Sequence, residues 1–209
     1  MKSSIKKDTF RAIYRLLDKV SPINDDCGSL CGAACCTCAD ESTAETAQCD
    51  SDCNADFEMG IYLLPGEEKL FTGREDWLSW GWLQAEDYEF PESWSGRVYF
   101  LRCQCAPHCP RQQRPLQCRF FPLAPHLDED GRLFLIYQSA ALPYSCPLIT
   151  EHIPLNEDFI RATYTVWKHL IRDPLIYDLV ELDSICRQED GEPIEIIYPP
   201  IPSAANNRS

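Results

Sequence analysis

The hydrophobic positions near the N-terminus follow a helical period. Phe10, Ile13, Tyr14, Leu17 and Val20 recur every three or four residues, as on one face of an α-helix. Asp8 stands where a capping side chain is expected, and Ser21-Pro22 ends the pattern. Residues 1–26 are therefore predicted to contain an amphipathic helix that packs on the core or on a second subunit.

The same period predicts two further helices in a C-terminal segment, residues 151–190. From Asn156 to Arg172 the apolar face comprises Phe159, Ile160, Thr163, Val166, Trp167 and Leu170. Asp173-Pro174 suits the start of the next helix, which we expect to reach about Ile185. Cys186 falls on the apolar face of this helix and is predicted to be a small buried hydrophobe. Residues 191–209 contain four prolines after Gly191 and are predicted to form an extended tail.

Between these helical segments, short apolar runs predict strands. They are Ile61 to Leu64, which could also be a turn, then Arg97 to Arg102, and a hairpin of residues 120–127 and 132–138. The hairpin turn contains Gly131, which suits a positive φ. Residues 74–88 place Trp77, Trp80 and Leu83 at helical intervals and predict a short helix. The chain of 209 residues fits one α+β domain, with helices around a small antiparallel sheet or hairpin.

Charge and composition exclude several classes of function. The formal net charge of −14 argues against nucleic acid as the partner, because phosphate binding requires a basic surface. The N-terminal stretch is basic, and we interpret it as a solvated helix face. No run of about 18 apolar residues occurs, so no membrane span is predicted. The start of the sequence has no apolar leader, and a cytoplasmic location is expected.

The cysteines are the most informative residues. Five of the thirteen fall within twelve positions, as Cys27, Cys31, Cys35, Cys36 and Cys38. Thiolates this close in sequence can bind one zinc or iron ion, because sulfur is a strong donor to both metals. A disulfide framework fits less well, since the cysteine count is odd and adjacent cysteines cannot pair without strain. Reactive redox thiols are a further alternative.

A second cysteine cluster follows the predicted strand at 97–102. It contains Cys103, Cys105, Cys109 and Cys118, and Cys146-Pro147 lies further on. Arg114 and Arg119 flank Cys118, and we expect their charge and hydrogen bonds to stabilise the thiolates. A metal bound by both clusters would close the long loop between them. We therefore predict that the clusters meet in space, so that residues 27–150 form a metal-binding core with cysteine loops held by metal.

These motifs resemble the YkgJ-like family of zinc- or iron-chelating proteins. The resemblance rests on the run ending in Cys35-Cys36, on Arg114-Pro-x-x-Cys118-Arg119 with its Phe-Pro ending, and on Cys146-Pro147. It implies cytoplasmic metal chelation. Flagellin lysine methylases are similar in carrying such a cysteine box, with an implied iron–sulfur cluster. This chain has no glycine-rich cofactor loop after a clear strand, so the methylase activity is not carried over.

The expected metal ligands are drawn from both clusters: Cys27, Cys31, Cys35, Cys36, Cys103, Cys109, Cys118 and Cys146. Eight thiolates could fill two zinc sites, or one four-cysteine site with spare thiols. A [4Fe-4S] cluster also takes four cysteines, so the spacing leaves zinc and iron open. The additional cysteines Cys38, Cys49, Cys53 and Cys105 are interpreted as exposed thiols, although Cys49 and Cys53 could complete a second site. His108 is the one histidine placed to ligate.

Three functions are compatible with this pattern. The first is a metal-binding protein whose biological role the residues do not specify. The second is an iron–sulfur oxidoreductase or methylase-like enzyme. The third is a scaffold that metal stabilises for binding a protein partner, which the sequence does not identify. No nucleophile with a neighbouring base and no paired carboxylates in a cleft stand out, so the sequence supports no catalytic residues.

Overall fold

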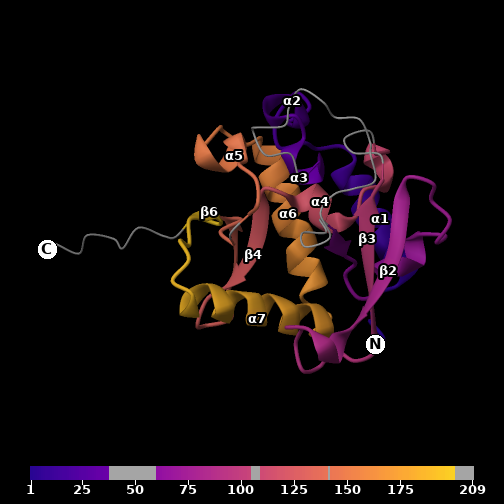
Figure 1. Ribbon diagram of the computed structural model, residues 1–209. Coiled ribbons are helices and arrows are strands. Elements are labelled where there is room, and N and C mark those ends of the chain that lie inside the picture. The colour runs from indigo at the N-terminus through magenta and orange to yellow at the C-terminus, as the bar shows by residue number, and fades with distance from the viewer. Residues whose placement is uncertain (38–59, 105–108, 141, 201–209) are drawn as a thin grey trace, which may run out of the picture.

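The computed structural model describes residues 1–37, 60–104, 109–140 and 142–200. Within these ranges the chain forms an α+β fold with two small antiparallel sheets (Figure 1). The longer helices are α1 (Lys7–Leu17), α6 (Glu157–Leu170) and α7 (Pro174–Glu189). Short helices are α2 (Gly28–Cys31), α3 (Ala34–Thr37), α4 (Leu116–Phe120) and α5 (Pro147–Thr150). Single 3-10 turns are η1 (Glu67–Leu70), η2 (Ala85–Asp87) and η3 (Arg111–Gln113).

The first sheet has the strand order β1-β3-β2. It contains β1 (Ile61–Tyr62), β2 (Leu78–Gln84) and β3 (Arg97–Cys103), with Trp80 opposite Leu101 and Leu78 opposite Cys103. The second sheet has the order β4-β5-β6 and contains β4 (Leu123–Leu127), β5 (Leu133–Tyr137) and β6 (Ile196–Tyr198). The predicted hairpin is confirmed as β4 and β5, with Gly131 at a φ of 71° in the turn.

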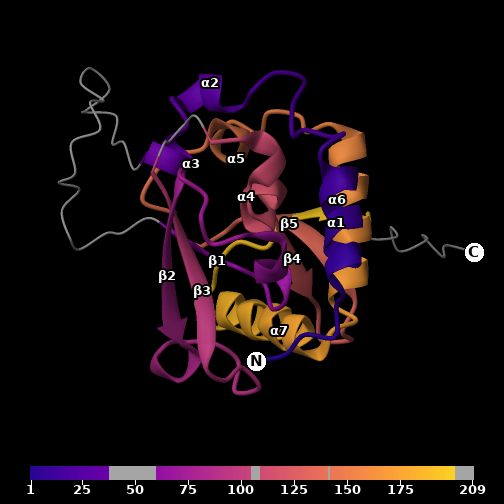
Figure 2. The same cartoon turned by 90° about the vertical axis from the view of Figure 1, so that its right-hand side faces the viewer.

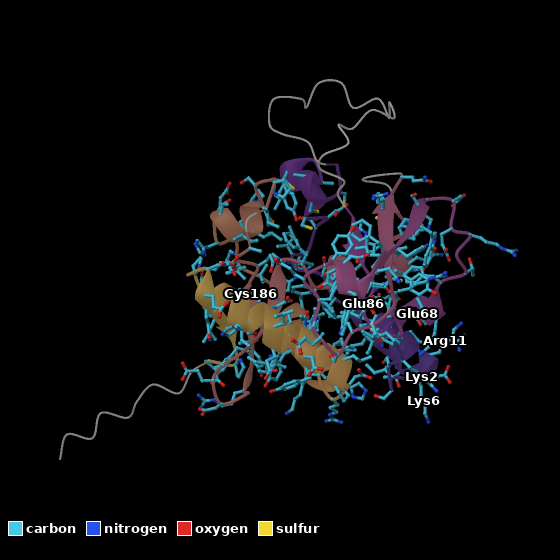
Figure 3. The ribbon with its side chains drawn as sticks, turned by 60° about the horizontal axis from the view of Figure 1, so that its bottom comes forward. Lys2, Lys6, Arg11, Glu68, Glu86 and Cys186 are labelled. Atoms are coloured by element: carbon cyan, nitrogen blue, oxygen red, sulfur yellow. The ribbon has the colours of Figure 1, made fainter. Side chains whose placement is uncertain are left out.

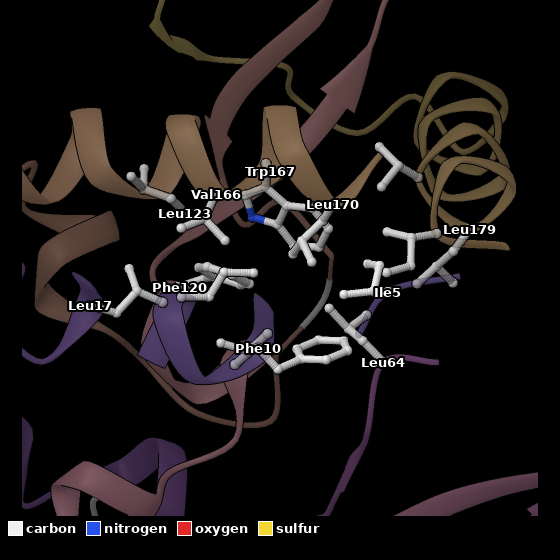
Figure 4. Packing of buried hydrophobic residues seen from close by; sticks show 14 of the residues in the cluster. Ile5, Phe10, Leu17, Leu64, Phe120, Leu123, Val166, Trp167, Leu170 and Leu179 are labelled. Atoms are coloured by element: carbon white, nitrogen blue, oxygen red, sulfur yellow. The ribbon is translucent and has the colours of Figure 1, made fainter. Parts of the chain in front are cut away.

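The main hydrophobic core lies where α1 and α6 pack side by side against α4, α7 and the second sheet (Figures 2 and 4). Phe10, Leu135, Leu170, Ile176 and Val180 are fully buried there. The ring of Phe120 from α4 meets Trp167 of α6 at a centroid distance of 4.8 Å. Burial of these side chains supplies the dominant stabilisation of this part of the molecule.

Two buried carboxylates connect distant segments to this core. Asp173 caps α7 by accepting from the Leu175 N–H, and it also accepts from Ser3 Oγ at 2.9 Å and Ser4 N at 2.6 Å. Glu67, which is fully buried, accepts hydrogen bonds from Tyr14 Oη and from the backbone N–H groups of Leu64 and Leu116. Glu67 therefore joins α1 to the start of α4.

Several sequence predictions were wrong in detail. Residues 78–84 form strand β2 instead of a helix, because Leu78, Trp80 and Trp82 also alternate with period two and pair with β3. Helix α1 begins after Lys6, so Asp8 lies inside its first turn and does not cap it. Helix α7 continues to Glu189, beyond the predicted end. The segment predicted to be an extended tail contributes β6 to the second sheet.

The prediction for Cys186 was also wrong, because its side chain is exposed on α7 (Figure 3). Helices α1, α6 and α7 otherwise lie where the hydrophobic period placed them. Among the described residues, no helix combines the length and apolar character needed to cross a membrane. The basic side chains of Lys2, Lys6 and Arg11 are exposed near the start of the chain, as a solvated face requires (Figure 3).

Candidate metal centre

The first cysteine cluster folds into two consecutive single-turn helices. Cys27 precedes α2 and Cys31 ends it, whereas Cys35 and Cys36 lie on α3. Gly32, at a φ of 60°, provides the left-handed turn between the two helices. The thiols of Cys35 and Cys36 are 3.8 Å apart. This turn changes the chain direction between Cys31 and Cys35.

The second cluster reaches the same end of the molecule from other elements. Cys103 ends β3, Cys109 precedes η3, Cys118 lies on α4, and Cys146 precedes α5. Figures 1 and 2 both place α2, α3 and α5 together beyond the end of α4. We name this region the cysteine end: α2, α3, α5, and the segment from Cys109 to α4.

Thiols from both clusters interact at the cysteine end. Cys36 interacts electrostatically with Cys109, and Cys118 interacts with both of these residues. Cys27 interacts in the same way with Cys146. The structure therefore brings together cysteines that are far apart in sequence. Each of the eight predicted ligands interacts with at least one other: Cys27, Cys31, Cys35, Cys36, Cys103, Cys109, Cys118 and Cys146.

Arg114 is the cation closest to these thiols. Its Nε donates to Cys109 Sγ at 2.9 Å, and its charge also acts on Cys27 and Cys36. A hydrogen bond from Cys103, assisted by the charge of Arg114, lowers the pKa of the Cys109 thiol to about 6. The contact with Cys35 lowers the pKa of Cys36 to about 7. Both thiols can therefore be deprotonated near neutral pH, which is the state that binds metal.

The environments of the other thiols differ. Burial raises the pKa of Cys27 and of Cys146, and a shared hydrogen bond with Cys36 raises the pKa of Cys35. Cys118 is exposed as a residue, although desolvation by the surrounding protein, added to the charges of Cys36 and Cys109, raises the pKa of its thiol. A bound cation would oppose these increases, because it favours every thiolate at once.

The described side chains do not form a preorganised set of metal ligands. Within residues 1–37, 60–104, 109–140 and 142–200, no three Cys, His, Asp or Glu groups are arranged to hold one ion. The donor chemistry nevertheless fits zinc or iron, since sulfur dominates and a guanidinium lies beside it. Rotation of side chains on short helices and loops would be needed to bring four sulfurs to about 2.3 Å from a metal.

Arg119, the other arginine predicted to stabilise the thiolates, instead contacts backbone and side-chain groups of the protein. Its Nε donates to the carbonyl of Arg114 at 2.7 Å, and its Nη1 pairs with Asp18 at 2.7 Å. Its guanidinium also lies 4.3 Å from the ring centroid of Tyr14. These contacts orient the loop that carries Arg114 and attach it to α1. A direct influence of Arg119 on bound metal stays a prediction.

A polar cavity of about 1010 Å³ adjoins the candidate centre. Cys109 and Arg114 line it, together with Asp25, Asp26, Arg111 and the first residues of α6. Sequence reasoning missed this cavity, because the start of α6 lies almost fifty positions beyond Cys109. Tyr144, whose pKa is raised by burial and by four nearby cysteines, was also missed, although its position two residues before Cys146 was a usable signal.

Several other cysteines and histidines do not belong to the described part of the cysteine end. Cys38, Cys49, Cys53, Cys105 and His108 lie outside the described residues. Cys186 lies on α7, away from the cysteine end (Figure 3). His126 is buried in β4, and its pKa is lowered first by burial and then by Arg187. His126 is thus a core residue of the second sheet.

Comparisons of the chain with protein-family models, with curated proteins and with solved structures found no match in any of the three.

Proposed function

We propose that this protein binds zinc or iron through cysteine thiolates at the cysteine end. The observation that carries the proposal is the meeting of Cys36 with Cys109 and Cys118, beside the guanidinium of Arg114. Three thiols from two separate clusters, with a cation next to them, are typical of a site that stabilises sulfur anions. The resemblance to YkgJ-like metal chelators points to the same function.

Two further features support thiolate ligation over disulfides. Eight described cysteines have free thiols: Cys27, Cys31, Cys35, Cys36, Cys109, Cys118, Cys146 and Cys186. The first cluster also lacks an apolar core of its own, since α2 contributes no buried residue. A bound metal would supply the missing stabilisation, because ligand bonds formed only in the folded state add directly to the free energy of unfolding. A cytoplasmic location fits this proposal, since thiols stay reduced there.

The cavity beside Cys109 favours one alternative, an iron–sulfur enzyme of the oxidoreductase or methylase-like kind. A structural metal site needs no adjoining space, whereas a reactive centre needs room for a substrate. Arg114 contacts the thiol and lines the cavity, so a molecule bound there would lie next to the centre. Visible absorption of protein purified without air would favour iron, and colourless protein with bound zinc would favour a structural ion.

The test compares two matched variants of protein purified without air. Cys118→Ser removes an exposed thiol at the cysteine end, and Cys186→Ser removes an exposed thiol on α7. Elemental analysis should find zinc or iron in the wild type and in Cys186→Ser, and less metal in Cys118→Ser. The melting temperature of Cys118→Ser should fall together with its metal content, because an under-coordinated ion no longer anchors α4.

Metal content below one ion per chain in all three proteins would contradict the proposal. If the wild type holds metal and Cys118→Ser holds the same amount with unchanged melting, then Cys118 is not a ligand. Serine is close to cysteine in size, so neither substitution leaves a core cavity at these positions.

A further inference from the structure

Strand β2 forms an unpaired edge of the first sheet. In the order β1-β3-β2, β3 covers one side of β2, and no strand among the described residues pairs with its other side (Figures 1 and 2). The register with β3 runs from Leu78 to Gln84 without a bulge. A regular edge of this kind offers a row of backbone hydrogen-bonding groups to an incoming strand.

A hydrogen bond at the end of the strand shows which groups point to this edge. The N–H of Ala85 donates to the carbonyl of Gly96 on the β3 side at 2.8 Å. Odd-numbered residues of β2 therefore bond to β3, because bonded and non-bonded positions alternate in an antiparallel ladder. The backbone N–H and C=O groups of Trp80 and Trp82 consequently point outward, and within the described ranges they have no hydrogen-bond partner.

This edge lacks the usual protection against strand pairing. Natural edges carry charged residues, proline or a bulge, but residues 77–85 contain no charged residue and no proline. On the outer face of the sheet Trp82 is 53% exposed and Tyr99 is 37% exposed. The Arg97 guanidinium lies 4.9 Å from the Trp82 ring centroid and holds this ring beside β3. Trp80 and Trp82 would lie next to side chains of an added strand, and such cross-strand pairs favour β-branched or aromatic partners.

Acidic side chains lie at both ends of the edge. Glu75 and Asp76 precede β2, and Glu86 and Asp87 follow it in η2, whereas Arg74 is the one basic residue of this stretch. In two copies of β2 paired antiparallel, the acidic end of one would lie beside the acidic end of the other, which like-charge repulsion disfavours. A partner strand with basic ends would instead place opposite charges together.

We propose that the free edge of β2 binds an extended peptide segment of a protein partner, with an uncharged, β-branched centre and lysine or arginine at both ends. The segment would add a strand to the sheet and exchange hydrogen bonds with the backbone of Trp80 and Trp82. Leu78 and Leu101 are buried together in a small core, so β2 is already anchored and loses little freedom when the peptide docks. This binding goes beyond the proposed metal site and does not require metal.

The experiment follows the fluorescence anisotropy of a labelled peptide, Lys-Lys-Val-Thr-Ile-Thr-Val-Lys-Lys, during titration with the full-length protein. Saturable binding is expected. A peptide with glutamate in place of every lysine should bind at least about 10-fold more weakly, because it places like charges together. The lysine peptide with N-methylated central amides should lose at least as much, since methylation removes the backbone donors and keeps the charge.

Substitutions test the edge from the protein side. Trp82→Thr keeps the outward N–H, removes the ring, and should weaken binding about 2- to 5-fold. Trp82→Pro also removes the N–H and should weaken binding at least about 10-fold, although it breaks no bond to β3. Asp76→Asn/Asp87→Asn should weaken binding about 3- to 10-fold. The control Glu189→Gln/Asp190→Asn removes two exposed carboxylates at the end of α7 and should leave the affinity unchanged.

Several results would overturn the proposal. Absence of saturable binding to the wild type would remove the site, and equal affinity for the acidic peptide would remove the stated partner chemistry. Unchanged affinity after N-methylation would show contact through charge alone, without strand addition. A dimer of the peptide-free wild type that Trp82→Pro dissociates in sedimentation would assign the edge to a second copy. If Trp82→Pro fails to fold, the three peptides on wild-type protein still decide the question.

Discussion

Helices α6 and α7 differ sharply from α2 and α3 in how they are held. The first pair has 14 and 16 residues and buries side chains along its length, including Phe159, Leu170 and Val180. The second pair has four residues in each helix, and Leu30 of α2 is 44% exposed. Isolated helices this short are not stable in water. Hydrophobic burial therefore accounts for α6 and α7, while α2 and α3 need another source of stability, such as metal.

Replacing one large apolar residue in each region gives the largest expected contrast. Phe159→Ala should lower the free energy of unfolding by about 3–5 kcal/mol, because this residue of α6 is fully buried in the core and its loss would leave a cavity. Leu30→Ala should cost at most about 0.5 kcal/mol, since its side chain already faces solvent. Urea unfolding of both variants measures the difference. Similar losses would show that packing governs both regions alike.

A pH series on Glu67 tests the buried connection between α1 and α4. Burial raises the pKa of Glu67 to about 7, despite opposing hydrogen bonds from Tyr14 and from the backbone of Leu116 and Leu64. The folded protein therefore holds a proton that the unfolded chain releases above its ordinary pKa of about 4.3. The stabilisation from this carboxyl is complete below about pH 4 and is lost as the pH rises through 7, by about 3 kcal/mol in total.

The measurement is the difference in unfolding free energy between wild type and Glu67→Gln from pH 4 to pH 8. Glutamine does not titrate, so the wild type should lose stability relative to the variant as the pH rises. Glu68→Gln, one residue away in η1, is the matched control for removing a carboxylate from this turn. A flat difference for Glu67→Gln would mean that its carboxyl has an ordinary pKa in the folded protein.

Arginine substitutions give the smallest effects and separate direct from indirect action on the metal. Arg114→Gln should weaken metal retention about 10-fold, because it removes the donor to Cys109 and the nearby charge. Arg114→Lys should be intermediate. Arg119→Gln should weaken retention less, since Arg119 acts through the Arg114 carbonyl. Chelator competition measures all three affinities, and a larger effect at Arg119 would reverse this order.

The sequence predicted those elements whose pattern has a single interpretation. The hydrophobic period of the segments that form α6 and α7 fits only a helix, and the turn at Gly131 fits only a hairpin. The structure contains these elements. Residues 78–84 were mistaken for a helix because aromatic residues there fit both periods, and only pairing with β3 decides between them. Cys186 was misplaced because the face of α7 that meets the core depends on tertiary packing.

The sequence indicated the candidate cysteines of the centre, but it did not indicate the residues around them. Cysteine spacing selected the candidate thiols, because donor chemistry depends on residue type. Their binding of metal stays a prediction. The role of Glu67 was not predictable, because its partners Tyr14 and Leu116 lie 53 and 49 positions away. The same is true of the contacts of Arg119 with Tyr14 and Asp18, which depend on how α1 packs on α4. Long-range polar contacts of this kind leave no local pattern.

The hydrogen bonds from Ser3 and Ser4 to Asp173 have a consequence for how the chain folds during synthesis. These partners are separated by about 170 positions, and helix α1 also packs on α6, near the other end of the chain. At typical ribosome speeds the first residues wait roughly 10–30 s for these partners to be made. The part of the apolar face of α1 that α6 covers therefore spends that time without its native neighbour, although η1 is made much earlier. We expect the nascent chain to depend on chaperones during this interval, until α6 and α7 emerge.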